Sequence, residues 1–526
     1  MSVGFPILTA IIVTPLAGAV AVVLSPGRRP EAARAIGFAT TAATAGFVGW
    51  LLWQFQAGRA GYQFVESHAW YRELGVRYIV GVDGISLFMV ALTAVLFPLG
   101  LLGSASITER VKAFTAWMLL LEAALMGVFL GLDLILFFVF FEIVLVPMYF
   151  VIVGWGHGRR VYAAMKFFIF TMAGSAFLLV GILSLAFLHQ SATGHLTFDL
   201  RTLTAWAPNG LATVTSRWLF LAFFVAFAVK VPLFPLHTWL PDAHTEAPTA
   251  GSVILAGVLL KMGAYGFLRF SLSLFPRASV DLAPLLLVLA TIGIIYGAVV
   301  AAMQPDLKRL VAYSSVAHLG FVTLGIFALT TQGLEGGIFT MISHGLTTAA
   351  LFLLVGFLYD RRHTREISAF GGLWKAAPIM GGVFLATAFA SIGLPGFSGF
   401  IGEFLVLIGT FIVHRPYAVI SAAGVILAAV YLLWAFQRAF TGEPEGDNAT
   451  TRDLGFRELC TVLPLLGLSL FLGIYPKPVL DRVEPTVKAL VCHVERHSDY
   501  RQPQVAEHAG RGFLGLDKLA CPKGTK

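Results

Sequence analysis

Apolar stretches of 18 or more residues recur along the whole chain, and no other feature restricts its fold as strongly. Each stretch is long enough to cross a membrane as a helix. Charged residues make up only 12% of the 526 residues and hydrophobic residues 58%, whereas a soluble domain is about 25% charged. The sequence therefore predicts an all-α integral membrane protein that crosses the bilayer many times.

Fourteen transmembrane helices are predicted from these stretches. Their approximate ranges are 3–24, 35–54, 85–104, 112–131, 133–153, 164–188, 217–239, 250–272, 282–302, 310–329, 336–358, 377–412, 417–440 and 458–475. The first range precedes the first arginines, the reverse of a signal peptide, so it is expected to remain as a span. Region 377–412 is too long for one straight crossing and contains Pro395 between two glycines, which predicts a broken helix.

A second break is predicted where Lys230 is followed by Pro232 and Pro235 inside an apolar run. A lysine at the centre of a membrane helix costs about 2.5–3.5 kcal/mol, so its presence indicates a function. Transporters build ion sites from a charge beside a broken helix. The alternative is a kinked span whose lysine reaches the membrane surface.

Positive charge is concentrated in alternate loops, which predicts the orientation. The loops richer in Lys and Arg carry Arg28, Arg29, Arg34, Arg110, Lys112, Arg159, Arg160, Lys166, Lys308, Arg309, Arg361, Arg362, Arg365, Lys375, Arg438, Arg452 and Arg457. The opposite loops chiefly hold Arg59, Arg72, Arg77, Arg201, Arg217, Arg277 and Arg415. We expect the first set to be cytoplasmic and both termini to lie outside. The polar tail after Tyr475 is expected to be peripheral or partly disordered.

The two predicted breaks indicate an inverted internal repeat. Pro232 can be aligned with Pro395, and the separation of Glu142 from Lys230 (88 residues) nearly equals that of His318 from Glu403 (85 residues). Elements five spans apart run in opposite directions, as in many transporters. Two helices kinked at glycine and proline can also match by chance.

Six ionisable residues inside the apolar spans are the candidate catalytic residues of a proton relay. They are Glu142, Lys230, Lys261, His318, His344 and Glu403. A buried Glu–Lys pair is marginal and can switch between a closed charged state and an open state that passes a proton on. Histidine titrates near neutral pH and relays protons through both ring nitrogens. The alternatives are a fixed ion pair between helices and hydrogen-bonded structural histidines.

Other polar residues leave alternatives open. Glu122 faces either a neighbouring subunit or the same wet channel. A cluster between two spans suits helix capping and proton entry better than metal binding, and its members are His237, Asp242, His244 and Glu246. The three cysteines are not spaced for zinc or an iron–sulfur cluster, and we expect no metal or cofactor in this chain. Neither a dinucleotide fingerprint nor a basic nucleic-acid-binding stripe is present.

Long motifs between about residues 82 and 440 resemble the proton-conducting antiporter-like membrane subunits of respiratory complex I. The motifs are Val-Lys-Val-Pro at 229–232, Leu-His-Thr-Trp-Leu-Pro-Asp-Ala-His at 236–244, Phe-Phe-Glu at 140–142, Pro-Met-Tyr at 147–149, Gly-Ser-Val-Ile-Leu-Ala-Gly at 251–257, Tyr-Ser-Ser-Val-Ala-His at 313–318 and Tyr-Asp-Arg-Arg-His-Thr-Arg at 359–365. The acid at Glu403 points to one branch, because the sister subunits carry lysine there. The resemblance implies Glu142 and Lys230 as a first pair, Lys261 as a connecting base, His318 and His344 as central relays and Glu403 as the exit acid.

The resemblance also implies a non-redox subunit of a proton-translocating NADH:quinone oxidoreductase in a bacterial cytoplasmic membrane. NADH, FMN, iron–sulfur clusters and quinone would then bind to partner subunits, which include two homologous antiporter-like subunits. A cation/proton antiporter or membrane-bound hydrogenase subunit, and a purely structural scaffold, are the alternatives. The predicted divisions are 1–110 (first three helices), 111–272 and 282–440 (two half-channel repeats), 441–475 (a loop and the last span) and 476–526 (a peripheral tail).

Overall fold

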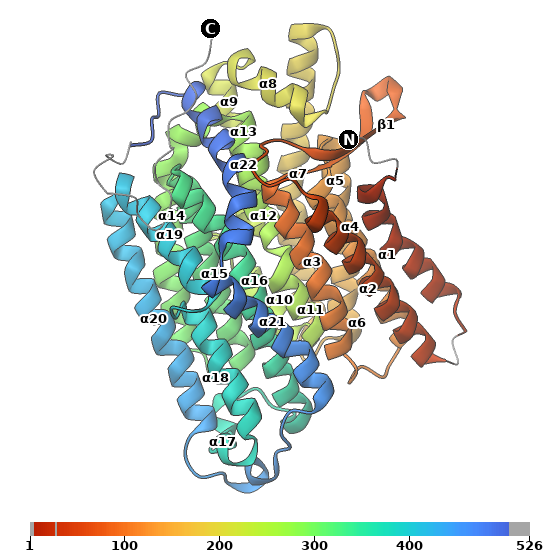
Figure 1. The fold of residues 1–526 in the computed structure, drawn as a ribbon, viewed down its shortest axis with the longest axis vertical. Helices are drawn as coiled ribbons and strands as arrows, with labels where there is room; N and C mark the ends of the chain where they lie inside the picture. Colours follow the sequence, from red (N-terminus) through yellow and green to blue (C-terminus); the bar gives the residue numbers. More distant parts are fainter. Residues whose placement is uncertain (1–4, 27–28, 504–526) are drawn as a thin grey trace.

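The computed structural model of the chain describes residues 5–26 and 29–503. Within them, thirteen helical segments are long and apolar enough to cross a membrane, and two shorter apolar helices supply one further, broken crossing. These helices pack side by side in one bundle (Figure 1). The structure confirms the all-α membrane fold and the fourteen predicted spans.

The spans follow one another with short connections, and several are interrupted. They comprise α1 (Ile7–Leu24), α2 (Pro30–Gln54), α3 (Gly84–Gly103), α4 (Val111–Leu130), α5 (Leu134–Ile143) with α6 (Leu145–Trp155), α7 (Arg160–Thr193), α9 (Thr213–Lys230) with the short α10 (Trp239–Glu246), Thr249–Leu274, α14 (Pro276–Ala302), α15 (Leu307–Phe327), α16 (Thr331–Arg362), α18 (Pro378–Ile392) with α19 (Ser398–Val413), α20 (Arg415–Phe440) and α21 (Phe456–Ile474). The central spans Thr249–Leu274 and α16 have their most apolar windows entirely buried, so they form the middle of the bundle.

The first break lies where the prolines predicted it. Because Pro232 has no N–H, the carbonyl of Ala228 instead accepts the N–H of Leu233 at 2.9 Å. The indole of Trp239 donates to the next freed carbonyl, that of Val229, at 2.9 Å. Helix α9 therefore ends at Lys230, which confirms the predicted break within 217–239, and the carbonyls that the break frees are satisfied by the chain that follows.

The second break is also confirmed. Helix α18 ends at Ile392, and the next residue, Gly393, caps it with a left-handed φ of 83° and an N–H that donates to the carbonyl of Phe389. Pro395 follows, and α19 begins at Ser398. The hydroxyl of Ser398 lies 2.8 Å from those of Ser343 in α16 and Ser469 in α21. The start of α19 is thus fixed against two other spans.

The arginine-rich loops meet at one end of the bundle, which we call the arginine-rich end. Lys308 bonds to the carbonyl of Ala247, and Arg365 bonds to the carbonyl of Thr245. Other loops of the same set are also joined by hydrogen bonds, including Arg110 to Gly154, Lys112 to Ser25 and Arg34 to Ile107. The predicted grouping of these loops agrees with the structure.

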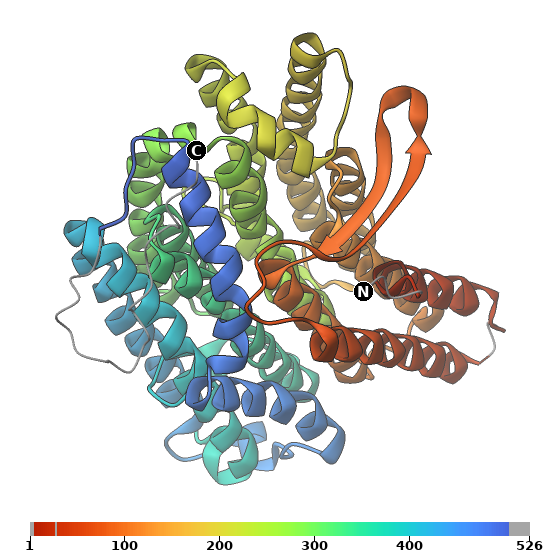
Figure 2. The ribbon, with the colours of Figure 1, turned by 45° about the horizontal axis from the view of Figure 1, so that its top comes forward.

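Three elements outside the spans were not predicted. A two-stranded antiparallel sheet, β1 (Gln63–Tyr71) and β2 (Val76–Val82), projects from the other end of the bundle (Figure 2). Helix α8 (Leu200–Gly210) lies between α7 and α9. Helix α22 (Lys477–Arg496) buries one apolar side against α3 and α16. Of the two expectations for the tail, peripheral or partly disordered, residues 477–496 do not fit disorder because they form a helix packed on the bundle, while residues 504–526 lie outside the described part.

Candidate functional site

Lys261 lies at the centre of Thr249–Leu274, one of the two spans whose apolar windows are entirely buried. A π-helical turn, Leu255–Leu259, precedes it, and a second one, Phe267–Ser271, follows. In the first turn the N–H of Leu260 bonds to Leu255, five residues back, at 3.2 Å. The carbonyl of Ala256 accepts a hydrogen bond from Nζ of Lys261 at 2.5 Å. The local change of helix type thus gives the buried amine a polar partner, as π-bulges often do at functional sites.

The second partner of Lys261 is a histidine. Nζ of Lys261 lies 2.7 Å from Nδ1 of His344, and both side chains are almost fully buried. An ammonium group can only donate, and a protonated imidazole can only donate as well. The contact therefore needs one of the two bases to be neutral, so the pair holds one proton fewer than its full capacity.

His318 and Glu403 form the next pair. Nδ1 of His318 lies 2.7 Å from Oε1 of Glu403, and the hydroxyl of Tyr431 lies 3.4 Å from the other ring nitrogen of His318. The rings of His318 and His344 have centroids 5.6 Å apart. Lys261, His344, His318 and Glu403 consequently form one row through the buried middle of the protein.

Lys230 and Glu142 are close to each other but not in contact. Lys230 is 1% exposed, and its Nζ has no hydrogen-bond partner among the described residues. Its ammonium lies over the rings of Phe141 and Phe167, 5.0 and 5.6 Å from their centroids. No ion pair within 4 Å joins Lys230 to Glu142 in the described chain. The structure shows this pair in an open arrangement instead of a fixed ion pair.

The end of α9 packs tightly against the span that holds Lys261. A Cβ added to Gly263 would lie 2.6 Å from the carbonyl oxygen of Phe227 and 2.7 Å from the nitrogen of Val231, so only glycine fits there. This close approach brings the break after Lys230 next to the helical turn that follows Lys261. In the described structure, however, no hydrogen bond connects Lys230 with Lys261.

The cluster at the first break divides into separate contacts. Asp242 forms ion pairs with Lys166 at 2.7 Å and Arg309 at 3.8 Å. His244 is fully buried, stacks on Phe352, and has no partner at either ring nitrogen. Among the described residues no three His, Cys, Asp or Glu side chains come together as metal ligands. The carboxylate of Asp242 therefore fixes helices at the arginine-rich end instead of joining the histidine.

Glu122 lies inside the chain's own bundle. Its side chain is fully buried in α4, and neither carboxylate oxygen has a hydrogen-bond partner in the described structure. The alternative that it faces a neighbouring subunit is therefore wrong for this structure. Among the described residues no hydrogen bond joins Glu122 to the row of Lys261, His344, His318 and Glu403.

One buried charged pair was missed. The guanidinium of Arg269 bonds to both oxygens of Asp83 at 2.5 and 2.8 Å and to the hydroxyls of Tyr62 and Tyr265. Burial alone would raise the pKa of Asp83, but Arg269 and bonds from Ser86 hold it below its usual range. The signal was present in the sequence, since Arg269 interrupts an apolar span as visibly as Lys261 does.

Known proteins with the same architecture identify the class. A family model described as NADH:quinone oxidoreductase/Mrp antiporter, TM, matches residues 131–430. A chain of respiratory complex I from Thermus thermophilus superposes with a TM-score of 0.85 at 32% identity, covering 93% of this chain and 99% of that one. A chain of the Mrp complex from Dietzia sp. has the same fold, with a TM-score of 0.79 at 22% identity over 93% and 98% of the two chains. The chain belongs to the antiporter-like membrane subunit family of NADH:quinone oxidoreductases and Mrp antiporters.

Sequence relatives narrow the class. The chain is 46% identical to NADH-quinone oxidoreductase subunit M of Rhodobacter capsulatus over 92% of this chain and 96% of that protein. It is 49% identical to the subunit M of Pseudomonas aeruginosa over 78% and 82% of the two chains. These relatives confirm the branch predicted from Glu403, which is the subunit M branch. The chain is accordingly a proton-translocating membrane subunit of an NADH:quinone oxidoreductase.

Proposed function

We propose that protons move sideways through the middle of this subunit along Glu142, Lys230, Lys261, His344, His318 and Glu403. The observation that carries the proposal is the row from Lys261 to Glu403, in which two short contacts are separated by one gap between imidazole rings. A row of acids and bases lets protons hop without leaving one charge alone in hydrocarbon. Each proton carried across performs work of about 2.3 kcal/mol per 100 mV.

The open Glu142–Lys230 pair gives the row a switch. When the two side chains meet, the ammonium is stabilised and holds its proton; when they separate, the amine can release it toward Lys261. In the open arrangement the cation has only aromatic rings around it, which stabilise it less than a carboxylate does. The open pair observed here supports a two-state role better than a permanent ion pair between helices.

The subunit itself carries out no redox step in this proposal. NADH, FMN, iron–sulfur clusters and quinone bind to partner subunits, and two homologous antiporter-like subunits are among its neighbours in the membrane. The arginine-rich end faces the cytoplasm, and both termini lie outside it, because positive loops remain inside. The bacterial cytoplasmic membrane is the location that suits this assembly.

A substitution at Glu403 tests the proposal. Inverted membrane vesicles that contain the whole complex are energised with NADH, and proton uptake is followed with a pH-sensitive dye. Glu403→Gln keeps the shape but removes the proton acceptor, so uptake per NADH oxidised should fall severalfold in an assembled complex. His414→Gln, at the end of the same helix and outside the row, is the matched control. Normal uptake in an assembled Glu403→Gln complex would contradict the proposed row.

A further inference from the structure

An apolar groove opens between α3, α16, α21 and the start of α22. Its volume is about 330 Å³, within the range of ligand sites in proteins. Leu92 of α3, Leu346 of α16 and Leu472 of α21 form its walls. The one charged residue that lines it is Arg482 of α22. The groove thus joins a hydrocarbon-like interior to a single cationic group.

The guanidinium of Arg482 is only partly satisfied. One terminal nitrogen donates to the carbonyl of Pro478 at 2.9 Å, while the buried Nε–H has no partner in the described structure. No described carboxylate lies within 4 Å to form an ion pair with it. A buried donor without an acceptor costs about 1–3 kcal/mol, and a guanidinium is suited to two oxygens of a phosphate. An anion that approaches along the groove would supply the missing partner.

The position of α22 indicates the source of that anion. This helix follows α21 after two residues and has an apolar side against the bundle and a charged side away from it, as helices at a membrane surface do. Arg482 consequently lies near the level at which a spanning helix leaves the hydrocarbon. We propose that the groove binds one phospholipid, with an acyl chain between α3 and α21 and the phosphate on Arg482.

The bound chain would lie behind the proposed proton row. Ile342 and Leu346, which line the groove, are each two residues from His344, so they point about 200° away from it around α16. An acyl chain in the groove would fill the space on the side of α16 opposite the Lys261–His344 contact. The site therefore adds apolar packing beside the row without contacting its polar atoms.

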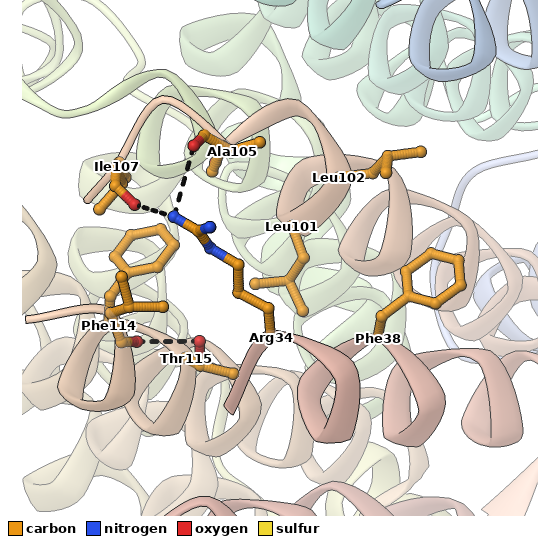
Figure 3. Close-up of a pocket in the computed structure, with 10 residues that line it drawn as sticks. Arg34, Phe38, Leu101, Leu102, Ala105, Ile107, Phe114 and Thr115 are labelled. Carbon is orange, nitrogen blue, oxygen red and sulfur yellow. Dashed lines mark hydrogen bonds between the residues drawn. The ribbon is translucent and has the colours of Figure 1, made fainter. Parts of the chain in front are cut away.

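A second arginine-bearing pocket provides a contrast. At the arginine-rich end, Arg34 lies beside apolar side chains in a pocket of about 120 Å³ (Figure 3). Its guanidinium already donates to the carbonyls of Ile107 at 2.6 Å and Ala105 at 3.4 Å. This pocket is smaller and its arginine has backbone acceptors, so the same reasoning assigns no lipid to it.

Photochemical labelling of the whole complex tests the lipid site. The purified complex is reconstituted with a phospholipid that carries a diazirine midway along one acyl chain, and adducts are mapped by mass spectrometry after irradiation. We expect adducts on Leu92, Leu346 and Leu472, which an excess of unlabelled phospholipid reduces at least fivefold. A free fatty acid, which has no phosphate, should reduce them by less than twofold.

Two pairs of variants separate the groove from general lipid contact. Ala91→Phe fills the groove and should lower labelling there at least fivefold, whereas Ala423→Phe on the exposed side of α20 should leave it unchanged. Arg482→Gln should lower it about threefold, and Arg415→Gln, an exposed arginine outside the groove, should not. Three results would overturn the proposal. They are the absence of adducts on these residues in the wild type, a cross-link from these residues to another subunit, and labelling of Arg482→Gln equal to that of the wild type. The arginine variants decide the matter even where Ala91→Phe does not assemble.

Discussion

Nζ of Lys261 lies 2.7 Å from Nδ1 of His344, so two basic side chains share a hydrogen bond in the buried centre of the protein. Such a contact requires one donor and one acceptor, and it therefore requires one of the bases to be neutral. A salt bridge between helices would instead pair a base with an acid. The contact suits the transfer of a proton between like groups.

Lys261→Arg should abolish most proton uptake although the positive charge remains. A guanidinium stays protonated, so it can neither accept a proton nor pass one to His344. We expect uptake in inverted vesicles to fall at least fivefold per NADH oxidised, with the complex still visible as one band on a native gel. Uptake equal to that of the wild type would mean that Lys261 serves only as a fixed charge.

His344→Leu tests the other member of the pair. The substitution removes the acceptor of Lys261 and interrupts the row before His318, so uptake should again fall at least fivefold. His189→Leu is a matched control, because His189 is similarly buried but bonds only within the segment that ends α7. If both histidine variants lowered uptake equally, the effect of His344→Leu would be structural.

The ion pair between Asp83 and Arg269 should be important for stability. Asp83→Asn keeps an acceptor for the start of α3 but leaves the buried guanidinium unpaired, which costs about 3–5 kcal/mol. The thermal midpoint of the complex in detergent should drop measurably. Asp199→Asn, which breaks the more exposed pair with Arg201, should cost about 1 kcal/mol or less. Equal midpoints for Asp83→Asn and the wild type would contradict this assignment.

Asp133 should make stability depend on pH. Burial, with a smaller contribution from the neighbouring Asp199, raises the pKa of Asp133 to about 6, although hydrogen bonds from three backbone N–H groups oppose the shift. In an unfolded chain the pKa is about 3.9, so the folded form binds more protons between these values. Protonated Asp133 therefore adds about 3 kcal/mol to the free energy of unfolding. This stabilisation is complete below about pH 4 and is lost as the pH rises through 6.

Thermal midpoints measured between pH 4 and 7 for wild type and Asp133→Asn provide the comparison. The difference in thermal midpoint between wild type and Asp133→Asn should change between pH 4 and 7 and should be constant above pH 7. A difference that does not vary with pH would show that Asp133 has an ordinary pKa in the folded protein.

Much of the fold could be predicted because apolar length and proline positions act locally. The breaks after Lys230 and around Pro395 follow from a missing N–H and a left-handed glycine, both readable in sequence. The partners of the buried groups could not be predicted. Whether Lys261 meets His344 depends on a π-helical turn and on packing between spans distant in sequence. The hairpin formed by β1 and β2 was missed for a different reason, since polar and aromatic residues at a membrane surface give only a weak strand pattern.

Lys230→Ala gives the most direct test of the proton row. NADH-driven proton uptake is measured in inverted vesicles, alongside NADH oxidation and a native gel of the assembled complex. We predict that Lys230→Ala and Glu142→Ala each lower uptake per NADH at least fivefold while assembly persists, and that the double variant is no worse than either. Normal uptake by a well-assembled Lys230→Ala complex would contradict the central claim that protons pass through this row.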